Sequence, residues 1–171
     1  MAALLLSPAG DKAGAPALTK EYRDPTGGFS FRTPEDWRVG PLADHPDVLE
    51  AAGGGLRVRF VHRNGEVAYD ALHAHCMLER LAGLMDASPD VRYEYDFVSW
   101  TVGDKRALDS AFTVRYDTPI DGQRVWRQRN VTVVGAGQSL CVIAHAPAPL
   151  WKKSPALRQT LDKVMGSVEL K

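Results

Sequence analysis

The hydrophobic pattern in the first third of the chain predicts short strands. Residues 28–32 alternate between apolar and polar side chains, and the run ends at Pro34, which has no backbone donor for a sheet. Residues 56–62 alternate in the same way, with their arginines facing outward. Between these runs, residues 48–52 follow the capping sequence Asp-His-Pro-Asp and predict a short helix. The three consecutive glycines 53–55 are expected to end it as a flexible turn, because the Lys and Ser or Thr of a phosphate loop are missing.

Two longer helices and a run of strands follow. Apolar side chains recur at intervals of three and four from residue 69 to 86, and again from 155 to 166 after a capping serine and a first-turn proline. The roughly 55 residues between them carry strand signals separated by three glycine-containing turns. Hairpins without intervening helices predict an α+β domain on a mostly antiparallel sheet. We expect residues 1–20 to be a flexible leader and 21–171 a single domain.

Turn positions predict the pairing of the strands. A two-residue turn at Gly103-Asp104 places Tyr93 opposite Val114, and a two-residue turn at Asp121-Gly122 places Phe112 opposite Val131. This register gathers aromatic and aliphatic side chains on one face. Two helices with one apolar stripe each can cover one face of such a sheet, so we expect them mainly on this one.

The opposite face of the predicted sheet is polar apart from two tryptophans. If it is open, it offers area and hydrogen bonds together, which favours the binding of a protein or peptide partner. The alternative is that the tryptophans pack beneath the N-terminal segment or the short helix. The candidate partner-binding residues are Trp100, Arg115, Trp126, Gln128 and Asn130.

Composition excludes several classes of protein. The 171 residues are 44% hydrophobic, which is enough for one core, and 21 basic residues balance 21 acidic ones. This balance argues against a nucleic-acid partner. No apolar run approaches the ~18 residues that cross a bilayer, so we expect a soluble domain without membrane insertion. Residues 1–8 lack the basic start and the apolar length of a signal peptide, which favours the cytoplasm.

No arrangement of reactive side chains predicts catalysis. Cys76 and Cys141 lie among apolar neighbours and are expected to be buried thiols. His75 and Glu79 are one helical turn apart, but two ligands do not make a metal site. His145 would lie roughly 13 Å from Cys141 along one strand, too far for a proton transfer. We therefore expect no enzyme, metal or cofactor, and the rival is a hydrolase in which His62, His145 and a cysteine converge from distant segments.

The two ends of the predicted domain resemble a known superfamily. Residues 22–37 (Tyr-Arg-Asp-Pro-Thr-Gly-Gly-Phe-Ser-Phe-Arg-Thr-Pro-Glu-Asp-Trp), the strand 137–143 and the closing Ser-Val-Glu-Leu at 167–170 are similar to the PsbP, Mog and DcrB-like superfamily. The resemblance implies an α-β-α or open α+β sandwich and a non-enzymatic role, as in photosystem lumen subunits, Ran-binding nuclear factors, periplasmic lipoproteins or the EagR-type adaptors of type VI secretion.

Among these branches, the absence of an export signal and an Arg- and Ala-rich composition favour a bacterial cytoplasmic adaptor or chaperone. In the EagR-like case the resemblance implies a homodimer that holds effector helices against its sheet. The alternatives are a small-ligand-binding or purely structural subunit of an assembly.

Overall fold

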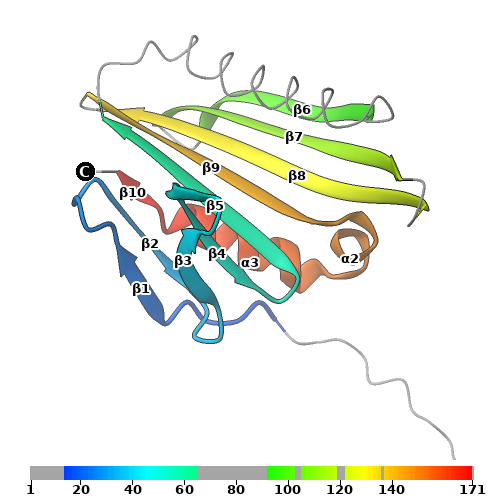
Figure 1. Cartoon of the computed structure of the whole chain (residues 1–171), viewed down its shortest axis with the longest axis horizontal. Coiled ribbons are helices and arrows are strands. Elements are labelled where there is room, and N and C mark those ends of the chain that lie inside the picture. The colour runs from blue at the N-terminus through cyan, green and yellow to red at the C-terminus, as the bar shows by residue number, and fades with distance from the viewer. Residues whose placement is uncertain (1–13, 65–91, 103–104, 119–121, 136, 171) are drawn as a thin grey trace, which may run out of the picture.

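The computed structural model describes residues 14–64, 92–102, 105–118, 122–135 and 137–170, which form two antiparallel sheets and two helices (Figure 1). The larger sheet has seven strands in the order β3-β4-β5-β9-β8-β7-β6, and the smaller has three in the order β1-β2-β10. The elements are β1 (Lys20–Arg23), β2 (Phe29–Thr33), β3 (Arg38–Leu42), β4 (His45–Gly53), β5 (Leu56–Asn64), β6 (Arg92–Val102), β7 (Lys105–Thr118), β8 (Gly122–Gly135), β9 (Gln138–Pro147), α2 (Ala148–Lys153), α3 (Pro155–Gly166) and β10 (Glu169–Leu170). The predicted α+β class with a mostly antiparallel sheet is confirmed.

The predicted four-strand meander is present as β6 to β9. Tyr93 pairs with Val114 in the first hairpin, as its turn predicts. The prediction for the second hairpin is wrong, because Thr118 pairs with Gly122 and Phe112 therefore lies opposite Gln128 instead of Val131. The last pair of this hairpin is Thr118 with Gly122, whereas the predicted turn would pair Ile120 with Gln123. The observed register differs from the predicted one by three residues. Because three is odd, each face of β8 is shared with the face of β7 opposite to the predicted one.

The helix predicted over residues 48–52 is also wrong, because these residues belong to strand β4. Ala51 pairs with Val39 on one side and with Val58 on the other. Pairing on both edges satisfies the backbone and buries Ala51 completely. Packing of this kind outweighs a weak local helix preference.

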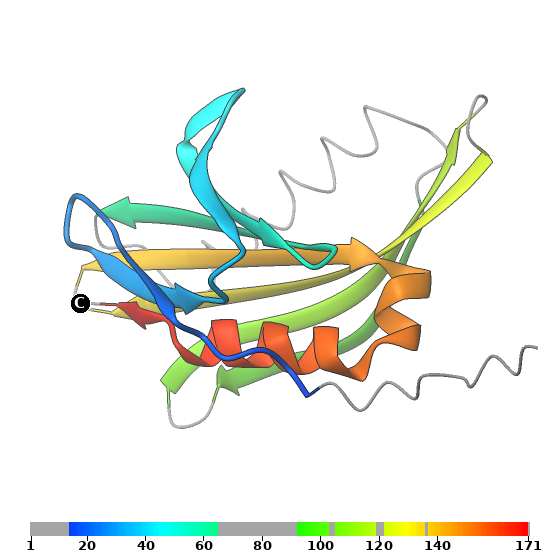
Figure 2. The same cartoon turned by 90° about the horizontal axis from the view of Figure 1, so that it is seen from below.

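The core lies where α3 and β2 pack on one face of the larger sheet (Figure 2). Ser154 caps the predicted helix α3 by accepting a hydrogen bond of 3.2 Å from the Leu157 amide. Leu161 is fully buried in the same cluster as Phe31 and Phe60, whose rings stack with centroids 4.0 Å apart. The helix at 155–166 is confirmed, and the sheet face beneath it is the one opposite the side chains of Arg57 and Trp126.

Several predictions concern residues outside the described ranges. These include the helix over residues 69–86, the thiol of Cys76 and the His75–Glu79 pair. The expectation that both long helices share one sheet face therefore stays a prediction. Cys141 is buried, at 5% exposure. Neither α2 nor α3, the helices in the described part, has the length and apolarity to cross a membrane.

The N-terminal segment already contacts the domain before the expected boundary at residue 20. The Lys163 ammonium group donates to the carbonyl oxygens of Ala15 and Pro16, at 3.0 and 3.3 Å. Leu18 packs against the core, and the Thr19 amide donates to the Thr33 carbonyl oxygen. Residues 15–19 therefore lie against α3 and β2 and belong with the folded part of the chain.

Candidate functional site

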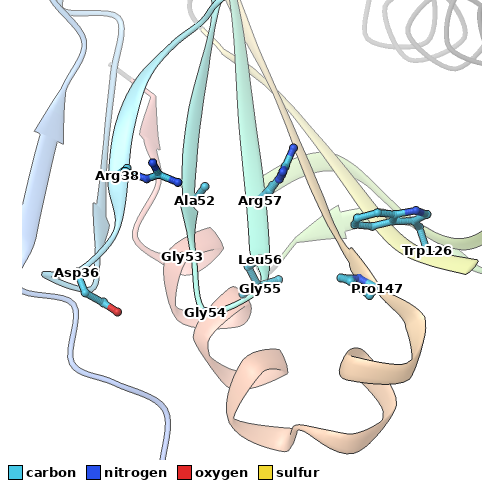
Figure 3. Close-up of a pocket in the computed structure, with 10 residues that line it drawn as sticks. All are labelled: Asp36, Arg38, Ala52, Gly53, Gly54, Gly55, Leu56, Arg57, Trp126 and Pro147. Atoms are coloured by element: carbon cyan, nitrogen blue, oxygen red, sulfur yellow. The ribbon is translucent and has the colours of Figure 1, made fainter. Parts of the chain in front are cut away.

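A groove of about 480 Å³ opens beside the β4–β5 turn, on the face of the larger sheet opposite α3 (Figure 3). It collects residues from five strands of that sheet, β3, β4, β5, β8 and β9, and from the loop before β3. We call it the Arg–Trp groove. Its lining residues are Asp36, Arg38, Ala52, Gly53, Gly54, Gly55, Leu56, Arg57, Trp126 and Pro147.

The three glycines give the groove its shape at the turn. Gly54 and Gly55 have φ values of 59° and 84°, a conformation that side chains with a Cβ rarely adopt. Gly53 has a different reason, because a Cβ there would lie 2.2 Å from Cδ1 of the Trp37 indole. The predicted turn is confirmed, and it ends β4 where the predicted helix was expected to end.

A row of paired residues crosses the groove from strand to strand. Arg38 of β3 pairs with Ala52 of β4, which pairs with Arg57 of β5, which in turn pairs with His145 of β9. Residues paired in this way place their side chains on the same face of a sheet. Two guanidinium groups therefore stand on either side of the short Ala52 methyl group.

The charges of these two arginines are not compensated within the described part of the chain. Arg59, two residues along β5 on the same face, forms an ion pair of 2.9 Å with Glu50 on the neighbouring strand. Arg38 and Arg57 are exposed and form no hydrogen bond or ion pair with any described residue. Asp36 lies at the edge of the groove farthest from Trp126 (Figure 3). The groove thus presents two cations that are available to an outside group.

Trp126 forms the apolar end of the groove. Its ring lies edge-on to the His145 imidazole, with centroids 5.7 Å apart and planes at 73°, and its strand partner is Pro147. The indole is half-buried and extends from β8 toward the side of the groove where Arg57 lies (Figure 3). An aromatic ring at one end of a groove that has two cations at its other end suits a ligand with both apolar and anionic groups.

Comparison with solved structures shows which known fold this architecture resembles. No family model and no curated protein matches the chain. Cyanobacterial PsbP from Synechocystis superposes with a TM-score of 0.60 at 14% identity, over 96% of this chain and 100% of that one. The Ran-binding protein Mog1p of Saccharomyces cerevisiae superposes with a TM-score of 0.56 at 9% identity, over 90% and 96% of the two chains. The chain has the PsbP/Mog-like fold. The fold implied by the resemblance of residues 22–37 is therefore confirmed.

Within this PsbP/Mog-like fold, Gln128 and Asn130 do not face solvent as expected. They are only 3% and 6% exposed, and the Gln128 amide donates a 2.9 Å hydrogen bond to the Asn130 side-chain oxygen. They do share a face with Trp126, as the alternation along β8 predicts. Because buried amides must satisfy each other, this pair supports the strand and offers little surface to a partner.

The other two predicted residues are not brought to the groove. Val114 pairs with Trp126, so Arg115, its neighbour in β7, lies on the opposite face of the sheet. Trp100 lies in β6 at a shift of register, and its side chain is outside the description. Of the five candidate residues, Trp126 alone lines the Arg–Trp groove, and the partner-binding role of the set stays a prediction.

The sequence contains a pattern that predicts the groove arginine Arg57, which is not among the five candidate residues. If Gly54-Gly55 is taken as a two-residue hairpin turn, Ala52 falls opposite Arg57 and Glu50 falls opposite Arg59, as the structure has them. The interpretation of residues 48–52 as a helix hid this pairing. It also hid the contrast between Arg59, which faces the carboxylate of Glu50, and Arg57, which faces Ala52.

The rival hydrolase arrangement does not assemble from the described residues. His62 pairs with Leu140, whereas Cys141 and His145 lie on the opposite face of β9. The Nε2–H group of His62 instead donates a hydrogen bond of 2.7 Å to the Gln138 side-chain oxygen. Over these residues no three His, Cys, Asp or Glu side chains gather as metal ligands.

A second cleft, of about 470 Å³, lies between the β1–β2 hairpin and the β3–β5 strands. Its lining includes the buried aromatic rings of Phe29 and Phe60 and the carboxylates of Asp24 and Asp47. Burial, with a smaller contribution from the Asp24 carboxylate, raises the pKa of Tyr22 above its ordinary value of 10.0. The Asp24 carboxylate already accepts hydrogen bonds from the Thr26 and Gly28 amides, so it is occupied in shaping the β1–β2 connection.

Proposed function

We propose that this chain is a non-enzymatic protein-binding module and that the Arg–Trp groove holds a segment of its partner. The observation that carries the proposal is that the half-buried Trp126 indole lines the same groove as the uncompensated Arg57 and Arg38 side chains. Tryptophan and arginine are the residue types most enriched at energetic centres of protein interfaces. The groove joins both types on one rigid sheet.

The fold is compatible with this role, since one protein that shares it, Mog1p, is a Ran-binding protein. A shared fold does not carry a partner from one protein to another, so the site must support the proposal by itself. In its specific form, the proposal is a bacterial cytoplasmic adaptor or chaperone similar to the type VI effector-loading proteins. The Arg- and Ala-rich composition supports that form, and homodimerisation is part of it.

A small ligand is the competing occupant. The volume of the groove, about 480 Å³, falls inside the range of roughly 300 to 1,000 Å³ that is typical of small-molecule sites. Small-molecule sites are enclosed and mostly apolar, whereas this groove is lined on one side by exposed Arg38 and Arg57. An exposed charged lining favours a macromolecular segment.

Affinity purification with Trp126→Ala as the subtraction control tests the proposed function. The wild-type chain and the variant are used as baits in lysate of the source organism, and Trp126→Phe serves as the variant that retains an aromatic ring. We expect a partner that wild type and Trp126→Phe retain and Trp126→Ala loses, followed by direct binding of the purified partner in calorimetry. If a correctly folded Trp126→Ala retains every partner, the groove is not the binding site. Light scattering of the purified chain, alone and with the partner, measures the expected dimer.

A further inference from the structure

The Arg–Trp groove has two cations at one end and an aromatic ring at the other, and this order defines a partner. We infer that the groove binds an extended acidic segment of a protein, with two carboxylates at Arg38 and Arg57 and an apolar side chain at Trp126. The inference rests on the proposed function, because it concerns the same groove. It adds the chemistry of the segment and its direction across the strands.

The charge argument is local to the groove. The whole chain has 21 basic and 21 acidic residues, so an uncompensated pair of arginines does not reflect a generally basic surface. On the same face the neighbouring Arg59 is compensated by Glu50, with side-chain exposures of 28% and 17%. The strand neighbours of Arg57 are Ala52 and His145, neither of which is a carboxylate. The missing carboxylates are the groups that a partner would supply.

The spacing of the three positions fits an extended chain that crosses the strands. Arg38 and Arg57 lie on either side of β4, so their backbones are two strand spacings apart, about 10 Å. Trp126 lies two strands beyond Arg57 and two residues farther toward the turn, about 12 Å away. Each interval corresponds to about three residues of extended peptide. The expected order is therefore acidic, acidic, apolar, at intervals of about three residues.

Ala52 makes room for such a chain between the two arginines. Its methyl group is the side chain between Arg38 and Arg57 in the cross-strand row. A larger residue at this position would project between the guanidinium groups and fill the floor of the groove. Ala52→Leu therefore blocks the segment without altering any charge.

Asp36 limits the acidic part of the segment at its other end. It lies at the edge beyond Arg38, on the side away from Trp126 (Figure 3). A carboxylate placed there would be repelled, so the acidic residues of the segment should not extend past Arg38. Neutralising this group by Asp36→Asn is expected to tighten the binding of the segment by about twofold, the size of an exposed charge effect.

The test is fluorescence anisotropy of labelled peptides with the purified full chain. The probe peptide has two Glu residues three positions apart and a Leu three positions farther, with Gly and Ser elsewhere. We expect it to bind at least about tenfold more tightly than the same peptide with Gln for Glu, and to weaken as NaCl is raised, because exposed charges are screened. A Ser-for-Leu peptide tests the contact with Trp126 and should also bind more weakly.

Variants of the chain locate the binding. Arg38→Glu, Arg57→Glu and Ala52→Leu should each weaken the probe peptide by about tenfold or more. Arg63→Glu is the matched control, because Arg63 is exposed on the same face of β5 about 20 Å from Arg57. It should change the affinity by less than about twofold. Circular dichroism and thermal unfolding confirm that each variant is folded.

The outcomes separate this inference from the proposed function. The inference of an acidic segment is overturned if the Glu and Gln peptides bind with equal affinity. It is also overturned if Arg63→Glu and Arg57→Glu weaken the affinity for the probe peptide equally. If the cellular partner is lost by Trp126→Ala but bound normally by both arginine variants, the binding module stands and the inference about its ligand falls. The last experiment uses inorganic phosphate as a competitor of the probe peptide. Full displacement of the peptide by millimolar phosphate, with no effect of the Leu, would show a simple anion site and would also overturn the inference.

Discussion

The indole ring of Trp37 lies directly against the backbone of Gly53. A Cβ at Gly53 would meet Cδ1 of that ring at 2.2 Å and Nε1 at 2.6 Å. Trp37 is 3% exposed and belongs to the core cluster. The last residue of β4 is therefore fixed to the core on one face, while its neighbour Ala52 lines the groove on the other.

Gly53→Ala is expected to destabilise the fold by roughly 1 to 3 kcal/mol, because the buried indole must move to admit a methyl group. Urea unfolding followed by circular dichroism measures the change in the free energy of unfolding. Gly40→Ala is the matched control in β3, since a Cβ there meets nothing within 4 Å. It should change stability by less than about 0.5 kcal/mol. Equal losses in the two variants would contradict the close approach of Trp37.

Gly28 and His62 form a second contact of this type. A Cβ at Gly28 would lie 2.1 Å from Cε1 of the imidazole, so Gly28→Ala is expected to cost roughly 1 to 3 kcal/mol. The cost should fall in a His62→Ala background, where the ring is gone. A double-mutant cycle measures the coupling, which we expect to exceed about 0.5 kcal/mol. Strictly additive losses would show that the two residues do not press on each other.

The raised pKa of Tyr22 predicts a loss of stability in alkaline solution. The unfolded chain releases this phenolic proton near the ordinary pKa of 10.0, whereas the folded chain holds it to a higher pH. Stability from this group is therefore complete below pH 10 and declines as the pH rises above it. Absorbance titration of the wild type against Tyr22→Phe gives the pKa.

Asp24→Asn removes the smaller cause of that shift. We expect the pKa of Tyr22 in this variant to move part of the way back, because burial, the larger cause, remains. A return to the ordinary value would show that the carboxylate, and not burial, dominates. The decline of stability at alkaline pH should be smaller in Tyr22→Phe than in the wild type, because this one group no longer contributes to it.

Ser154 is expected to contribute to stability as the cap of α3. Its hydroxyl oxygen accepts from the Leu157 amide at 3.2 Å, and its removal by Ser154→Ala should cost about 1 kcal/mol. Ser154→Asp retains an acceptor and should keep most of that stability. Thermal unfolding of the three proteins is the measurement, and an Asp variant as unstable as the Ala variant would argue against capping.

Local signals predicted the elements that depend on local chemistry. The capping serine and proline before α3 act over a few residues, and the structure has both. Residues 48–52 form a strand against their local helix pattern, because β3 and β5 pair with them from both sides. No window within the segment contains that information.

In the candidate site, too, local patterns predict some features, whereas others depend on contacts between strands. Alternation along β8 placed Trp126, Gln128 and Asn130 on one face, which is how the structure has them. Alternation says nothing about how far solvent reaches that face, and Gln128 and Asn130 are buried. The arginines of the groove required the β4–β5 register, so a correct hairpin assignment at Gly54-Gly55 would have found them from the sequence.

The small sheet also bears on how the chain folds during synthesis. Ser30 of β2 pairs with Glu169 of β10, and the Arg32 amide donates to the Ser167 hydroxyl 135 residues away along the chain. During synthesis β1 and β2 are made before the other described strands. The second neighbour of β2, β10, is made only after almost the whole of this domain has been synthesised. Until then one edge of β2 is open, so a chaperone that shields Phe29–Thr33 in the nascent chain would act where premature association is easiest.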